Sequence, residues 1–198
     1  MATSYFTKLF TADTTLCADP VIDLINTRVT DNMNDGLCAD FTDKEISYAP
    51  FQIGPLKASG SDGFPARFFQ RNWDVMREQV IAGVKEFFSS GRMPEGVNDT
   101  SIVLIPKVDK PERLTEYRPI SLCNIIYKVV AECLVNRLRP ILDEIISLEQ
   151  SAFVPGQMIT DNALVAFECI YSIQQEKKPE NSFCAYKLDL SKAYDRVD

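Results

Sequence analysis

Histidine is missing from this chain of 198 residues, and its six cysteines never form the closely spaced pairs that bind zinc. Without histidine the sequence has neither the commonest general base nor the usual nucleophilic triads. A zinc knuckle is excluded as well, because such sites need Cys and His ligands at short spacing. Any chemistry must therefore run on carboxylates and metal ions.

Long apolar runs and positive charge are also scarce. No segment approaches the roughly 20 apolar residues needed to cross a bilayer, and the N-terminus lacks the apolar core of a signal peptide. We therefore expect a soluble, intracellular protein without a membrane partner, whether nuclear or cytoplasmic. The formal net charge of −7 argues against a generic nucleic-acid binder, because affinity for phosphate rests on Lys and Arg. One stretch differs: Val103 to Arg139 holds seven basic residues against four acidic ones.

The segment from Lys187 to Asp198, KLDLSKAYDRVD, is the most informative one. From Phe183 onward apolar and polar residues alternate, which is typical of a strand with a buried back and an open front. Asp189 falls on the polar front and would face a cleft, and the aromatic Tyr194 follows five positions later. On position alone, an Asp on such a face is more often merely solvated, and Tyr194 is most simply a core aromatic.

Periodicity elsewhere favours helices with few strands, an α+β fold. Thr42 followed by Glu45 is a capping-box pattern that predicts a short helix over Phe41 to Phe51. Ile102 to Ile105 reads as a strand halted by Pro106, followed by a hairpin return or a loop up to Arg118. Further helices are expected over Trp73 to Phe87 with a stop at Gly91, over Leu122 to Leu138 with an end near Pro140, and over Asp161 to Lys178 with Asp161 as N-cap.

Several segments in order resemble the reverse transcriptases of non-LTR (LINE-type) retrotransposons, in the form found in plants. LDLSKAYD, with Asp189 and Tyr194, looks like the first palm motif of that family. The stretch from Ser101 to Leu142, with Lys107 in IPK and Arg118 in YRPISL, looks like its fingers block. Two further stretches match with changes: KASGSDG stands where KAPGPDG is usual, and SAFVPGQ has Gln157 where an Arg is usual.

The resemblance implies the roles of five groups. Asp189 would be a metal ligand, and the backbone carbonyl of Leu190 would serve a second magnesium ion. Tyr194 would be the steric gate that selects deoxynucleotides. Lys107 and Arg118 would contact the phosphates of the incoming nucleotide. Without the resemblance, the simplest interpretation of both residues is that they are surface charges flanking a loop.

The resemblance also implies an organisation and a function. We expect an acidic, loosely held arm over residues 1–40, a helical N-terminal extension over 41–100, fingers and connecting helices over 101–182, and a first palm strand over 183–198. The implied function is a part of an RNA-directed DNA polymerase that adds dNTPs to a DNA primer on an RNA template with Mg²⁺. We expect this chain to be inactive alone, because a two-metal site needs several carboxylates.

Two alternatives stay open. The chain could be a non-enzymatic remnant of a mobile element that still binds nucleic acid, or an inert helical domain descended from one. The net charge favours the inert domain over the binding remnant, whereas the ordered motifs favour a polymerase origin. The glycine-rich KASGSDG loop lacks the GxxxxGK[ST] spacing of a P-loop, and we interpret it as a turn that packs the N-terminal extension against the fingers.

Overall fold

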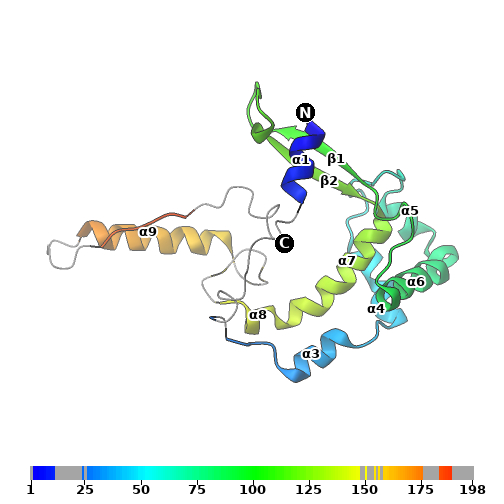
Figure 1. Ribbon diagram of the computed structural model, residues 1–198. Coiled ribbons are helices and arrows are strands. Elements are labelled where there is room, and N and C mark those ends of the chain that lie inside the picture. Colours follow the sequence, from blue (N-terminus) through cyan, green and yellow to red (C-terminus); the bar gives the residue numbers. More distant parts are fainter. Residues whose placement is uncertain are drawn as a thin grey trace. The chain divides into compact units, whose positions relative to one another are not determined.

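The computed structural model describes residues 2–11, 24, 26–147, 150, 154, 156, 158–175 and 183–188. The chain divides into two units, one formed by residues 29–141 and the other by residues 1–28 together with 142–198. Within the described residues, no helix is long and apolar enough to span a membrane. Figure 1 shows the elements of each unit.

The unit of residues 29–141 is built from five helices and one hairpin. The helices are α3 (Asp31–Cys38), α4 (Asp43–Gln52), α5 (Ala66–Arg71), α6 (Trp73–Ser90) and α7 (Ile125–Leu138). The predicted helices over 41–51, 73–87 and 122–138 are confirmed as α4, α6 and α7. Their ends follow local chemistry: Thr42 and Glu45 form the predicted capping box of α4, and Gly91 caps α6 in the left-handed region at φ 67°.

One apolar core joins α4, α5, α6 and α7. Val84 of α6, Ile46 of α4 and Val129 of α7 are almost completely buried in it. Since α4 and α6 both pack against α7, the residues expected to form the extension and the fingers share this core (Figure 1). Its buried members are Ile46, Ala49, Ile53, Ala66, Phe69, Val80, Ile81, Val84, Ile125, Val129, Val130 and Cys133. On α7 itself Ile125, Val129, Val130 and Cys133 are buried, whereas Leu134 and Leu138 are exposed.

The hairpin consists of β1 (Thr100–Pro106) and β2 (Tyr117–Cys123), which pair antiparallel with Ile105 opposite Arg118. It extends the predicted strand by two residues at its start and shows that the segment up to Arg118 is a hairpin return. A 3-10 turn, η1 (Leu114–Glu116), precedes β2. Apolar side chains on both faces of the hairpin are exposed, among them Ile102, Val103, Ile105 and Ile120. The second 3-10 turn, η2 (Arg139–Ile141), ends α7 at the predicted proline.

The KASGSDG loop packs where the hairpin meets α7. Asn124, buried between β2 and α7, accepts a hydrogen bond from the Asp62 backbone N–H and donates to the carbonyls of Gly96 and Val97. Gly60 lies so close that a Cβ placed on it would stand 2.6 Å from the carbonyl carbon of Cys123 and closer still to Asn124. The loop is therefore a packing turn, as the sequence predicts.

The other unit contains α1 (Ala2–Phe10), α8 (Leu142–Ile145) and α9 (Ile159–Gln175). The start of α9 corrects the predicted cap: the helix begins before Asp161, whose carboxylate accepts a hydrogen bond from the backbone N–H of Met158. Residues 183–188 form no strand pair with any described segment, and Tyr186 and Leu188 are exposed. A strand needs a neighbour to complete its hydrogen-bond ladder, and alternation of side chains does not supply one.

Candidate functional site

The turn end of the hairpin brings Lys107 and Arg118 onto one face. Residues directly opposite each other in an antiparallel pair share a face, so Arg118 lies on the side of Ile105. Lys107 is two residues beyond Ile105, and its backbone N–H donates to the carbonyl of Glu116 at 2.7 Å, which continues the ladder by one step. The alternation therefore places both cations on the same face as diagonal neighbours.

The two cations differ in what they contact. Arg118 is exposed, and it makes no ion pair with any residue in the described part of the chain. Lys107 is exposed too, but its Nζ donates to the carbonyl of Thr115 at 3.2 Å across the turn. Pro119 follows Arg118 and disfavours helical backbone at that position. The guanidinium is thus held on an extended strand and is free to bind an anion.

A carboxylate organises the turn between the strands. Glu116 accepts hydrogen bonds from the backbone N–H groups of Arg113, at 3.0 Å, and of Glu112, at 2.7 Å. These two hydrogen bonds lower the pKa of Glu116. The turn therefore keeps a negative charge beside its basic residues. Between Thr100 and Cys123 four basic residues stand against three acidic ones, so the hairpin is only weakly positive.

The three basic residues on and after α7 contact the protein itself. Lys128 donates to the carbonyl of Ala58 at 2.5 Å, and so ties α7 to the KASGSDG loop. Arg139 forms an ion pair with Glu132. Arg137 enters a larger network with α3 and α4. The sequence groups these residues with the basic stretch of the fingers, yet their charges are engaged within the fold.

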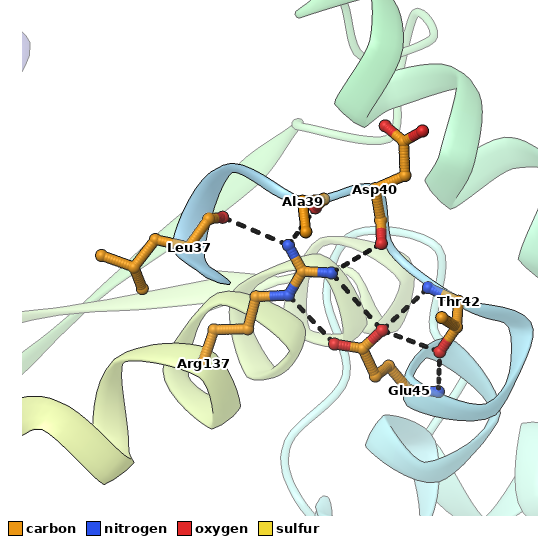
Figure 2. A network of polar contacts seen from close by, with 6 residues as sticks. All are labelled: Leu37, Ala39, Asp40, Thr42, Glu45 and Arg137. Carbon is orange, nitrogen blue, oxygen red and sulfur yellow. Dashed lines mark hydrogen bonds and ion pairs between the residues drawn. The ribbon is translucent and has the colours of Figure 1, made fainter. Parts of the chain in front are cut away.

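Figure 2 shows the network of Arg137. Its Nε lies 3.0 Å from Oε1 of Glu45, and its Nη atoms donate to the backbone carbonyls of Leu37, Ala39 and Asp40 at the end of α3. Glu45 also accepts hydrogen bonds from Thr42. The hydrogen bond from Arg137, with those of Thr42, lowers the pKa of Glu45 to about 2. Sequence reasoning missed this role of Arg137, because the only local signal was the capping box around Glu45.

The remaining site residues of the sequence analysis lie outside the described part of the chain: Asp189, Leu190, Tyr194 and Gln157. The structure thus brings Lys107 and Arg118 together and leaves the first palm motif untested. Among the described residues, no group of three or more Cys, Asp and Glu could hold a metal ion. A carboxylate and a backbone carbonyl, the groups that Asp189 and Leu190 offer, are nevertheless the oxygen donors that Mg²⁺ prefers.

Comparison with known proteins gives two similarities. Residues 105–198 match the family described as reverse transcriptase (RNA-dependent DNA polymerase). The chain is 31% identical over 170 residues to the Transposon TX1 uncharacterized 149 kDa protein of Xenopus laevis. The aligned region covers 86% of this chain but only 13% of that relative. Together the two similarities support a reverse transcriptase segment related to a transposon protein, and the chain spans only a small part of the length of that relative.

Proposed function

We propose that this segment serves RNA-directed DNA synthesis, and that the β1–β2 hairpin contacts the triphosphate of the incoming dNTP. One observation carries the proposal: the hairpin register sets Lys107 and Arg118 on one face at the turn end. A point charge beside a planar, forked guanidinium suits a chain of phosphates. In this proposal Arg118 binds two phosphate oxygens, and Lys107 exchanges its contact with Thr115 for the neighbouring phosphate.

The first palm motif completes the proposal. Asp189 and the backbone carbonyl of Leu190 would hold magnesium, and Tyr194 would close the sugar site against a 2′-hydroxyl. Bound magnesium would stabilise the charge that develops on the transferred phosphoryl group. The plant affiliation is a narrower proposal that rests on the wording LDLSKAYD alone.

We further propose that the segment binds the RNA template and DNA primer weakly. A chain with a formal net charge of −7 repels a polyanion, and the hairpin adds only a weakly positive surface. The few phosphate contacts that remain give a shallow dependence of affinity on salt, since each contact contributes a fixed increment to the slope. Gln157, in place of the usual Arg, would remove one further contact.

The test measures binding of a fluorescein-labelled RNA–DNA primer-template by the 198-residue protein. Fluorescence anisotropy across a salt series compares the parent protein with Lys107→Ala and Arg118→Ala. Arg92→Ala is the control, because Arg92 is exposed and lies outside the hairpin. We expect weak, salt-sensitive binding that both hairpin variants reduce and the control leaves unchanged. Tight binding at physiological salt, or indifference to both substitutions, would contradict the assignment and favour an inert remnant.

A further inference from the structure

A second basic surface lies away from the hairpin, beside α5. A cavity of about 680 Å³ is lined by the turn after α4 and by one side of α5. Its lining residues are Gly54, Pro55, Leu56, Lys57, Arg67, Gln70 and Arg71. Three of the seven are cationic and none is acidic, so the cavity concentrates positive charge in a chain that is acidic overall.

The three cations have no carboxylate to neutralise them. All three are exposed, and none takes part in an ion pair within the part of the chain that the structure describes. Asp62 is the one acidic residue between Gly54 and Arg71, and its Oδ1 accepts a hydrogen bond from the backbone N–H of Phe64. Like charges gathered around one cavity repel each other, and a bound anion would relieve that repulsion.

The backbone under these side chains is firmly held. Gln70 donates from Nε2 to the carbonyls of Pro50 and Ile53, both at 2.9 Å. The backbone N–H of Arg67 donates to the carbonyl of Pro55 at 3.0 Å, and Phe69 is buried in the core. Arg67 and Arg71 are four residues apart on α5, so they lie on the same side of the helix. The site is thus anchored in the protein, and only its charged ends need to adjust to a ligand.

We propose that this cavity, through Lys57, Arg67 and Arg71, binds the phosphate backbone of a nucleic-acid strand. The inference rests on the proposed function, which supplies the nucleic acid, and it adds a contact surface outside the hairpin. Two guanidinium groups and an ammonium group can each contact a different phosphate oxygen, and an open cavity admits a continuous strand. The exposed apolar side chain of Leu56 at the rim can pack against a sugar or base.

The position of the cavity within its unit supports a strand over a small ion. The loop that follows Lys57 docks on the junction of β2 and α7, through Lys128 to Ala58 and through Asn124 to Asp62. The cavity and the hairpin are therefore fixed to the same unit of residues 29–141. In this proposal a strand long enough to reach from the cavity to the hairpin contacts both surfaces, whereas a free phosphate contacts only one.

The test uses the full chain with a fluorescein-labelled oligo(U) RNA, followed by anisotropy between about 50 and 200 mM salt. The triple variant Lys57→Gln, Arg67→Gln, Arg71→Gln removes the cations of the cavity. A matched triple variant, Lys44→Gln, Arg77→Gln, Arg92→Gln, removes three exposed cations of the same unit that lie outside it. Circular dichroism and thermal unfolding check that each variant is folded. We expect the cavity variant to lose at least about tenfold in affinity, and its salt slope to fall by about 0.7 for each lost phosphate contact.

Several outcomes would overturn the proposal. Equal losses in the two triple variants would mean that only total charge matters. A loss of binding in Lys107→Gln and Arg118→Gln with none in the cavity variant would refute the cavity and leave the proposed function standing. If the parent protein does not bind RNA at low salt, both the cavity proposal and the proposed function are rejected. Inorganic pyrophosphate is the competitor: if it displaces the RNA from the parent at a concentration of phosphate groups equal to that of the RNA, the site binds small anions and not a strand.

Discussion

The guanidinium of Arg137 and the carboxylate of Glu45 meet through two contacts, Nε to Oε1 at 3.0 Å and Nη2 to Oε2 at 3.4 Å, although the residues are 92 positions apart in the chain. The same guanidinium carbon lies 3.4 Å from the centroid of the Phe41 ring, which stacks on Phe88. One side chain of α7 thus joins the end of α3, the start of α4 and, through Phe41, Phe88 of α6.

Replacement of Arg137 should destabilise this unit strongly. Arg137→Ala leaves the Glu45 carboxylate and three backbone carbonyls without their donor, and we expect a loss of about 2 kcal/mol in the free energy of unfolding. This figure is below the range for fully buried pairs, because Glu45 is 39% exposed and partly screened by water. Urea unfolding measures the effect. Arg139→Ala is the control. Its ion pair with Glu132 is partly exposed, so we expect this substitution to lower the free energy of unfolding by less than about 1 kcal/mol. Equal effects of the two substitutions would disprove the role of Arg137.

Acid should weaken the same link. The folded-state pKa of Glu45 is lowered from 4.5 to about 2, so the unfolded chain binds a proton at this carboxyl before the folded protein does. The contribution of Glu45 is therefore fully present above about pH 4.5 and is lost as the pH falls toward about 2. Urea unfolding of the parent and of Glu45→Gln at several pH values tests this. The gap in stability between the two proteins should narrow over that window, and a constant gap would count against the linkage.

Two glycine substitutions should act in opposite directions. Gly60→Ala places a Cβ against Asn124 and Cys123, and we expect a loss of about 1–3 kcal/mol from overpacking. Gly83→Ala lies within α6 with nothing inside 4 Å of the added carbon, so the better helix propensity of Ala should stabilise by about 0.5–1 kcal/mol. Thermal unfolding of both variants provides the comparison. A harmless Gly60→Ala would mean that the loop does not pack on the junction.

Cys133 should resist alkylation in the folded protein. Burial raises the pKa of its thiol from 9.0 to about 11, and the thiolate is the reactive form. With iodoacetamide at mildly alkaline pH, we expect Cys133 to react about two orders of magnitude more slowly than the exposed Cys38, as read by peptide mass spectrometry. In urea, where the protein is unfolded, the two cysteines should react at similar rates. Fast labelling of Cys133 without denaturant would show that the core of α7 opens readily.

The 198-residue protein should not extend a primer. In the proposed function Asp189 is the palm-motif carboxylate of this segment, and two magnesium ions need several converging carboxylates. A primer-extension assay on an RNA template, with Asp189→Ala as the matched control, measures this. Template-dependent incorporation that disappears in Asp189→Ala would overturn the expectation.

The sequence predicted the helices and strands whose ends carry a local signal, such as a capping residue, a glycine or a proline. The capping box of Thr42 and Glu45, the left-handed Gly91 and the pattern around Pro106 lie within a few residues of the features they predict. The sequence grouped Lys107 and Arg118 in one block, and the hairpin sets them on one face because it joins neighbouring segments. Contacts across long separations gave no such signal. Arg137 was counted only as one of the basic residues of Val103–Arg139, and α3, whose residues are mostly polar, was not expected within the N-terminal arm.

The cavity beside α5 could not be predicted from the sequence either. Lys57 is ten residues from Arg67, and only the folding of α5 back onto the end of α4 brings them to one surface. The charge count of the sequence directed attention to Val103–Arg139 instead. There the three cations on and after α7 turned out to contact the protein itself.

The shared core of α4, α6 and α7 also sets the order in which this protein can mature on the ribosome. Helices α4 and α6 leave the exit tunnel with Ile46 and Val84 uncovered, because their partner Val129 has not yet been synthesised. At typical elongation rates of about 5–20 residues per second, these apolar faces stay exposed for several seconds. We therefore expect that α4 and α6 cannot complete a stable fold until α7 has emerged.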